Sequence, residues 1–115
     1  MIDVYIDGAS AGNPGPSGAG IFMKWENGQV RTFSIPTGVL SNHEAEYEAL
    51  LRALRLCIEL GVTKASFRTD SQLIDQALEK RYVRNKQYRS YLVEALALID
   101  QFELFFYEMD TESAK

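Results

Sequence analysis

The order of the predicted strands and helices is the feature that most constrains how this chain can fold. Residues Ile2–Asp7 alternate between apolar and polar side chains, as a half-buried strand does. Two further strand patterns follow at Gly20–Trp25 and Val30–Ile35. The segment between them contains Asn27-Gly28, and Asn-Gly is the strongest short signal for a hairpin. The chain therefore opens with antiparallel strands, and the small, turn-forming residues 8–18 predict a loop.

Helices and strands alternate after this hairpin. Ser41 or Asn42 can cap a long helix that runs to about Leu60, where Gly61 can end it. The later patterns predict a strand, two helices and a final strand, in the order Lys64–Thr69, Gln72–Leu78, Lys86–Phe102 and Phe105–Met109. This order predicts an α/β domain with a mixed five-stranded sheet, in which the last two strands join in parallel through helical crossovers. A length of 115 residues fits one domain over residues 1–115.

Composition excludes several classes of protein. A hydrophobic fraction of 46% with 24% charged residues supports an ordinary globular core. No apolar run approaches the ~18 residues that a membrane span needs. A net charge of −4 argues against a protein that binds its partner by bulk positive charge. The single cysteine, Cys57, excludes an internal disulfide and a cysteine-based zinc site. We therefore expect a cytoplasmic protein with no membrane partner, and the composition does not indicate an oligomeric state.

Glu46 is the residue of the long predicted helix that needs an explanation. At about 100° per residue it falls in the middle of an apolar face formed by Ala49, Leu50, Ala53, Cys57 and Leu60. A carboxylate that is buried without a partner loses several kcal/mol of hydration. Glu46 therefore either stays partly solvated near the helix start, where the helix dipole favours it, or has a functional partner.

Two aspartates follow predicted strands. Asp7 ends the first strand and Asp70 ends the strand after the long helix, and functional groups of α/β sheets gather at such strand ends. Each also has an ordinary explanation, because Asp7 precedes a turn glycine and Asp70 can cap a helix. Together with Glu46, however, these carboxylates would repel one another at one sheet edge unless a cation held them. Oxygen ligands of this kind favour Mg²⁺ or Mn²⁺, with Ca²⁺ possible.

Three separated motifs carry a resemblance to a known family. They are Asp7-Gly8-Ala9-Ser10 with the trailing Gly12-Asn13-Pro14-Gly15, then Asn42-His43-Glu44-Ala45-Glu46-Tyr47-Glu48-Ala49-Leu50, then Thr69-Asp70-Ser71-Gln72-Leu73. Together they resemble the type 1 ribonuclease H family, in its short bacterial and archaeal branch, over nearly the whole chain. The resemblance implies a ribonuclease H-like fold and an endonuclease that hydrolyses the RNA strand of RNA–DNA hybrids. It places Asp7, Glu46 and Asp70 on the catalytic, metal-binding carboxylates of the family.

The implied chemistry is two-metal hydrolysis of a phosphodiester bond. Two cations about 3.5–4 Å apart activate the attacking water and stabilise the leaving oxygen. In this arrangement Asp7 bridges both Mg²⁺ or Mn²⁺ ions. Glu46 holds the ion nearer the leaving oxygen, and Asp70 holds the ion that activates water.

Substrate-binding residues are implied by the same resemblance. Ser10 and nearby backbone amides would read the 2′-hydroxyl that distinguishes RNA from DNA. Asn13, Asn42 and His43 would face the minor groove of the hybrid. The alternative for His43 is a solvated residue in the first helical turn. A role as a metal ligand is not expected of it, since no second histidine accompanies it.

A basic stretch later in the chain has two explanations. It contains Lys80, Arg81, Arg84, Lys86 and Arg89, interleaved with Tyr82, Tyr88 and Tyr91. The stretch either contacts phosphates, which would add salt-dependent affinity, or is a solvated connection between two helices.

The chain departs from the family pattern at its C-terminal end. The family has a fourth carboxylate that opens a final helix, and by our alignment that residue and helix would come just beyond Lys115. Asp110 or Glu112 could partly substitute for it. Two alternatives to a hybrid-cleaving enzyme therefore stay open. One is a catalytically weak nucleic-acid-binding module of the same fold, and the other is a small-molecule α/β module.

Overall fold

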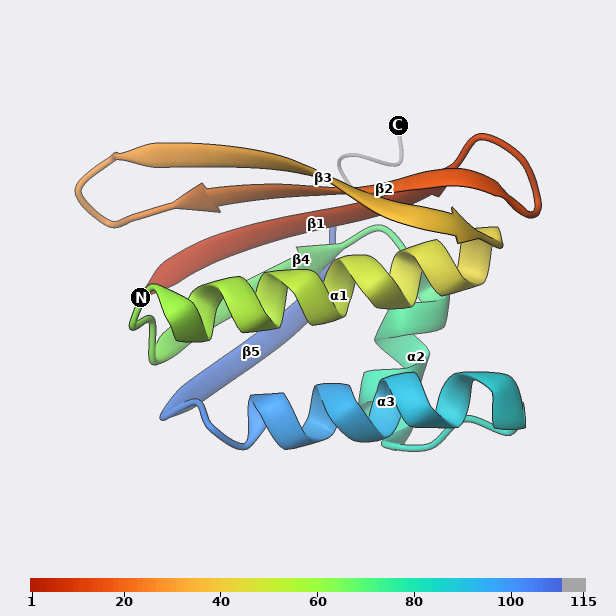
Figure 1. The fold of residues 1–115 in the computed structure, drawn as a ribbon. Helices are drawn as coiled ribbons and strands as arrows, with labels where there is room; N and C mark the ends of the chain where they lie inside the picture. The colour runs from red at the N-terminus through yellow and green to blue at the C-terminus, as the bar shows by residue number, and fades with distance from the viewer. Residues whose placement is uncertain (111–115) are drawn as a thin grey trace.

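Five strands form one mixed sheet in the spatial order β3-β2-β1-β4-β5, and the computed structural model describes residues 1–110 (Figure 1). Strands β1 (Ile2–Ser10), β2 (Gly15–Lys24) and β3 (Val30–Leu40) are antiparallel neighbours. Strands β4 (Lys64–Thr69) and β5 (Leu104–Met109) add in parallel beside β1. The predicted element order and mixed sheet are therefore confirmed.

The hairpin at Asn27-Gly28 forms as predicted. Gly28 has a φ of +88°, and its N–H donates to the carbonyl of Trp25. The predicted loop at residues 8–18 is wrong over most of its length, because β1 and β2 remain paired up to Ser10 and Ser17. Small residues do not forbid strand pairing, and β2 is bonded to a neighbour on both sides. Asp7 consequently lies inside β1 and does not end it.

Helix α1 (Asn42–Glu59) packs against the sheet and is the longest helix of the described residues. Its N-cap is Ser41, which forms a capping box with Glu44: each side chain accepts a hydrogen bond from the other residue's backbone N–H. Leu60, predicted on the apolar face, is the C-cap and is 40% exposed. The buried face is wider than predicted, because α1 contacts both the sheet and another helix; it also includes Tyr47, Leu51 and Leu54.

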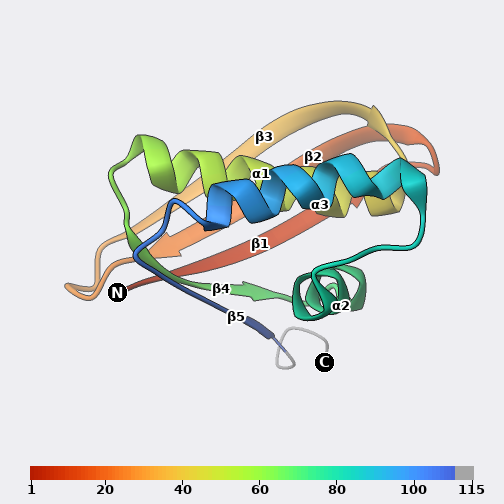
Figure 2. The same ribbon diagram turned by 90° about the horizontal axis from the view of Figure 1, so that it is seen from below.

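Two further helices complete the fold on the same side of the sheet as α1 (Figures 1 and 2). Helix α2 (Gln72–Lys80) follows β4, and helix α3 (Lys86–Ile99) packs against α1. No helix formed within residues 1–110 is long and apolar enough to cross a membrane.

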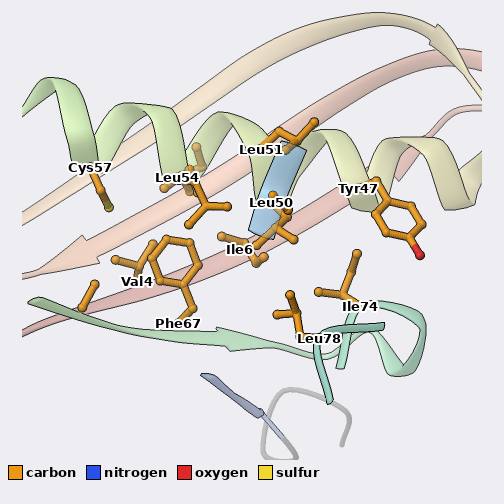
Figure 3. Packing of buried hydrophobic residues seen from close by; sticks show 14 of the residues in the cluster. Val4, Ile6, Tyr47, Leu50, Leu51, Leu54, Cys57, Phe67, Ile74 and Leu78 are labelled. Carbon is orange, nitrogen blue, oxygen red and sulfur yellow. The ribbon is translucent and has the colours of Figure 1, made fainter. Parts of the chain in front are cut away.

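The core lies between the sheet and α1. Val4 and Ile6 of β1, Phe67 of β4 and Leu50 of α1 meet there, with Ile74 of α2 at one end (Figure 3). Successive side chains of a strand point to opposite faces of the sheet. The strand register therefore decides which polar side chains lie on the face away from the core.

Candidate active site

Strand pairing brings Asp7 and Asp70 together. Ile6 of β1 pairs with Thr69 of the parallel strand β4, so the two aspartates occupy the next positions along adjacent strands. Both side chains are exposed. Asp70 is not the cap of α2, because the N-cap is Ser71, whose hydroxyl accepts from the N–H of Ile74. The ordinary explanation of Asp70 as a helix cap therefore does not apply.

Glu46 reaches the same place because strand β1 and helix α1 touch through a glycine. A Cβ added at Gly8 would stand 2.1 Å from the carbonyl oxygen of Ala45 and 2.9 Å from the Cα of Glu46. Only glycine permits such an approach. The backbone next to Asp7 is thus in contact with the helical turn that carries Glu46.

The electrostatics of Glu46 reflect this convergence. Its side chain is half-buried, and burial is the main reason that its pKa lies above the ordinary value. The negative charges of Asp70 and Asp7 raise the pKa further, while a hydrogen bond with Ser71 and the neighbouring His43 lower it. A nearby cation would therefore stabilise the ionised form of Glu46.

A further aspartate lies at this edge of the sheet. The N–H of Asp110 donates to the carbonyl of Thr69 at 2.8 Å, and Asp110 follows β5 as Asp70 follows β4. Asp7, Asp70 and Asp110 line one hollow of about 360 Å³. The sequence signal was an aspartate directly after each of two neighbouring parallel strands. Glu112, the other suggested substitute, lies outside the described residues.

The donor set suits a hard divalent cation, since it consists of carboxylates from separate elements. Within residues 1–110, however, no three histidine, cysteine or acidic side chains stand close enough to hold a metal ion. What strand register and the contact at Gly8 bring to one edge of the sheet are thus the backbone positions of Asp7, Glu46 and Asp70.

The predicted substrate-binding residues lie around the start of α1. The Asn13 side-chain oxygen accepts a hydrogen bond of 3.0 Å from the N–H of Asn42, so these two residues are in contact. His43 is exposed and meets the ring of Tyr88 edge-on, with the ring centroids 5.9 Å apart. The hydroxyl of Ser10 lies 2.9 Å from the carbonyl oxygen of Leu40 and accepts a hydrogen bond from the N–H of Gly12, so it links the residue 11–14 turn to the end of β3.

The basic stretch divides into two groups. Arg89 points back toward the segment between α2 and α3. Its guanidinium donates to the carbonyls of Val83 and Arg84 and to the hydroxyl of Tyr82. The arginine therefore holds the connection between α2 and α3 in shape. Lys80 and Arg84 are exposed and line a separate hollow on this side of the molecule.

A mixed sheet with helices on one side and acidic residues at the ends of its parallel strands defines a ribonuclease H-like domain. The family described as "Reverse transcriptase-like" matches residues 5–108 of this chain. The chain belongs to this family and, within it, to the type 1 ribonucleases H, as its motifs predicted.

Several relatives support this assignment. A protein of Enterococcus faecalis, named provisionally as the hydrolase EbsB, is 36% identical over 98% of this chain and 84% of its own. Ribonuclease HI of Halobacterium salinarum is 37% identical over 67% of this chain, which spans only 39% of that protein. The crystal structure of that archaeon's RNase H1 has a TM-score of 0.87 at 31% identity, covering 94% of this chain and 83% of the other.

A fourth comparison involves nucleic acid. LC11-RNase H1, whose structure was solved in complex with an RNA/DNA hybrid, has a TM-score of 0.81 at 27% identity. The match covers 99% of this chain and 89% of that structure's chain. The match thus extends over most of a protein whose structure was solved with an RNA/DNA hybrid.

Proposed function

We propose that this chain is a divalent-metal-dependent endonuclease domain that hydrolyses the RNA strand of RNA–DNA hybrids. The observation that carries the proposal is that the backbone positions of Asp7, Asp70 and Glu46 lie close together at one edge of the sheet. Register places the two aspartates side by side, and the contact at Gly8 brings in Glu46. Relatives that are named ribonuclease H, one solved with a hybrid, support the substrate class.

The carboxylates would be the ligands of Mg²⁺ or Mn²⁺. Both aspartate side chains are exposed, so they can turn toward a cation without repacking the core. When bound, divalent ions lower the pKa of the attacking water and stabilise the charge on the leaving oxygen. Glu46 would lose its proton more readily on binding, because a cation opposes the burial and repulsion that raise its pKa.

The substrate would lie across the start of α1. The 11–14 turn is fastened there by Ser10 and by the contact of Asn13 with Asn42. Polar side chains and backbone N–H groups presented together suit the 2′-hydroxyls and base edges of an RNA strand in a shallow minor groove. His43, exposed beside Glu46, is placed to contact the same strand. A cytoplasmic location accords with the free, buried Cys57.

Cleavage of a labelled hybrid tests the proposal. The substrate is a duplex with a labelled RNA strand, incubated with Mg²⁺, with Mn²⁺ or with a chelator. We expect cleavage only with a divalent ion, and its loss in Asp7→Asn with the circular dichroism spectrum unchanged. Asp3→Asn is the matched control, because Asp3 lies on the same strand and the same face of the sheet, four residues from Asp7.

The outcomes separate the open alternatives. Cleavage by Asp7→Asn at the parent rate would contradict the proposed site. Tight binding of the hybrid without cleavage in either metal would instead identify a nucleic-acid-binding module. Failure to bind any duplex at low salt would favour a small-molecule role.

A further inference from the structure

A buried threonine lies beside the candidate metal ligands. Thr69 is the last residue of β4 and is only 5% exposed, whereas the next residue, Asp70, is exposed. Thr69 has a strand neighbour on each side, since it pairs with Ile6 of β1 and with Met109 of β5. The strands that lead to the candidate carboxylates therefore meet at Thr69.

The side chain of Thr69 closes the turn that carries Asp70. Its Oγ1 accepts a hydrogen bond of 3.0 Å from the N–H of Ser71, two residues further along the chain. Hydroxyl side chains shape turns in this way by taking the place of a backbone acceptor. Both neighbours of Asp70 are thus fixed, Thr69 by the sheet and Ser71 by the hydroxyl of Thr69.

Ser71 connects this turn to α2 and to Glu46. Its hydroxyl accepts from the N–H of Ile74 as the cap of α2, and it also forms a hydrogen bond with the Glu46 side chain. The bond between the Ser71 N–H and Thr69 is itself buried. Removal of the Thr69 hydroxyl would therefore leave a buried donor without its partner and loosen the turn.

The backbone of Thr69 also holds the aspartate after β5. The Thr69 carbonyl accepts the bond of 2.8 Å from the N–H of Asp110. Thr69 lines the same hollow as Asp7, Asp70 and Asp110. One buried residue thus supports two of the acidic positions, one through its hydroxyl and the other through its carbonyl.

We propose that Thr69 is a positioning residue for the divalent-ion site, and that its hydroxyl sets the direction in which the Asp70 carboxylate is presented. This inference rests on the proposed function. Thr69 acts through the backbone of Asp70 and not by contacting the reacting atoms. Groups that orient metal ligands contribute about 10- to 100-fold to metal affinity or activity. A threonine with a structural role alone would change the stability and leave the metal affinity of the folded protein unchanged.

Three variants isolate the hydroxyl. Thr69→Val keeps the branched shape of threonine and removes the acceptor. Thr69→Ser keeps the hydroxyl and should restore the behaviour of the parent. Thr37→Val is the matched control, because Thr37 lies on β3 and outside the hollow, and its hydroxyl has no hydrogen-bond partner within residues 1–110.

Binding of Mn²⁺ without nucleic acid is the first measurement, with the free ion followed by electron paramagnetic resonance. We expect about tenfold weaker Mn²⁺ binding in Thr69→Val, and binding like that of the parent in Thr69→Ser and Thr37→Val. Cleavage kinetics are the second measurement. In Thr69→Val we expect a lower kcat with an unchanged KM for the hybrid, because the proposed substrate contacts lie at the start of α1.

Amide hydrogen exchange tests the hydrogen bond itself. The N–H of Ser71 should exchange slowly in the parent and in Thr69→Ser, and faster in Thr69→Val. Circular dichroism checks that each variant is folded at the temperature of the assays. If Thr69→Val does not fold, Thr69→Ala replaces it, and the exchange of Ser71 in the parent still tests the assignment.

The outcomes separate this inference from the proposed function. Equal Mn²⁺ affinities in the parent and a folded Thr69→Val would overturn the positioning role, even if the parent cleaves hybrids. Equal losses in Thr69→Val and Thr37→Val, or rapid exchange of Ser71 in the parent, would also overturn it. Weaker Mn²⁺ binding in Thr69→Val, together with a parent that cleaves no hybrid, would support the positioning role and contradict the proposed function. A parent that binds no Mn²⁺ would overturn both.

Discussion

The contact between Gly8 and α1 gives the sharpest prediction, for the variant Gly8→Ala. The added methyl carbon would stand 2.1 Å from the Ala45 carbonyl oxygen, whereas ordinary contact begins at 3.4 Å. The three heavy atoms nearest to it all belong to the backbone, so no side chain can move aside. Helix α1 would have to retreat from β1 by about 1 Å or more.

Two consequences follow from that shift. Overpacking of this kind costs about 1–3 kcal/mol, and each kcal/mol lowers the melting temperature of a domain of roughly this size by about 4–8 °C. We therefore expect Gly8→Ala to melt about 5–20 °C below the parent. Because the shift moves Glu46 away from Asp7, hybrid cleavage should also fall by about 100-fold.

The assay compares Gly8→Ala with Gly18→Ala. Gly18 also lies in the paired strands, but a Cβ there would meet only the Ile35 carbonyl oxygen at an ordinary 3.5 Å. Melting is followed by circular dichroism, and cleavage is measured well below the melting point of each variant. The reasoning would be refuted if Gly8→Ala kept the melting temperature and cleavage rate of the parent. The reasoning would also be refuted if Gly8→Ala and Gly18→Ala lowered the melting temperature and the cleavage rate by the same amount.

Four further predictions concern single side chains. The pKa of Glu46 is higher in the folded protein than its ordinary value of 4.5, so ionisation of Glu46 destabilises the folded state as the pH rises above that value. In a chelating buffer, Glu46→Gln should therefore have a higher melting temperature than the parent at neutral pH. The difference should vanish in acid. Asp110→Asn should require more Mg²⁺ for half-maximal cleavage, while Glu108→Gln, on strand β5 just before it, should leave the titration unchanged. Ser41→Ala removes the cap of α1 and should cost about 1 kcal/mol in urea unfolding. Burial raises the pKa of Cys57 to about 12, so thiol reagents should label it at pH 8 only after unfolding.

The candidate site shows which features can be read from local sequence. Asp7, Glu46 and Asp70 stood out as candidates in local patterns, and the three motifs that resemble the ribonuclease H family implied their metal-binding role. The order of strands and helices, the hairpin at Asn27-Gly28 and the cap at Ser41 were also predictable, since turns and caps depend on a few adjacent residues.

Strand ends and side-chain directions were less predictable. The small residues after Asp7 predicted a loop, yet β1 continues to Ser10 because β2 lies beside it. Arg89 belongs to a basic stretch for which the sequence left two explanations open, phosphate contact or a solvated connection, and its guanidinium turns back onto the connection before its own helix. Both outcomes depend on neighbours that are brought together by folding.

The amino-acid sequence by itself determined the kinds of element and their order, because these follow from hydrophobic period and turn chemistry along the chain. It also offered the candidate carboxylates, through motifs that resemble the ribonuclease H family. Only the tertiary structure decided that Asp110 lies beside Asp70 and that Gly8 brings Glu46 to them. The physical reason is that parallel register and helix-to-sheet distance are set by packing between segments far apart in the chain, which no local pattern encodes.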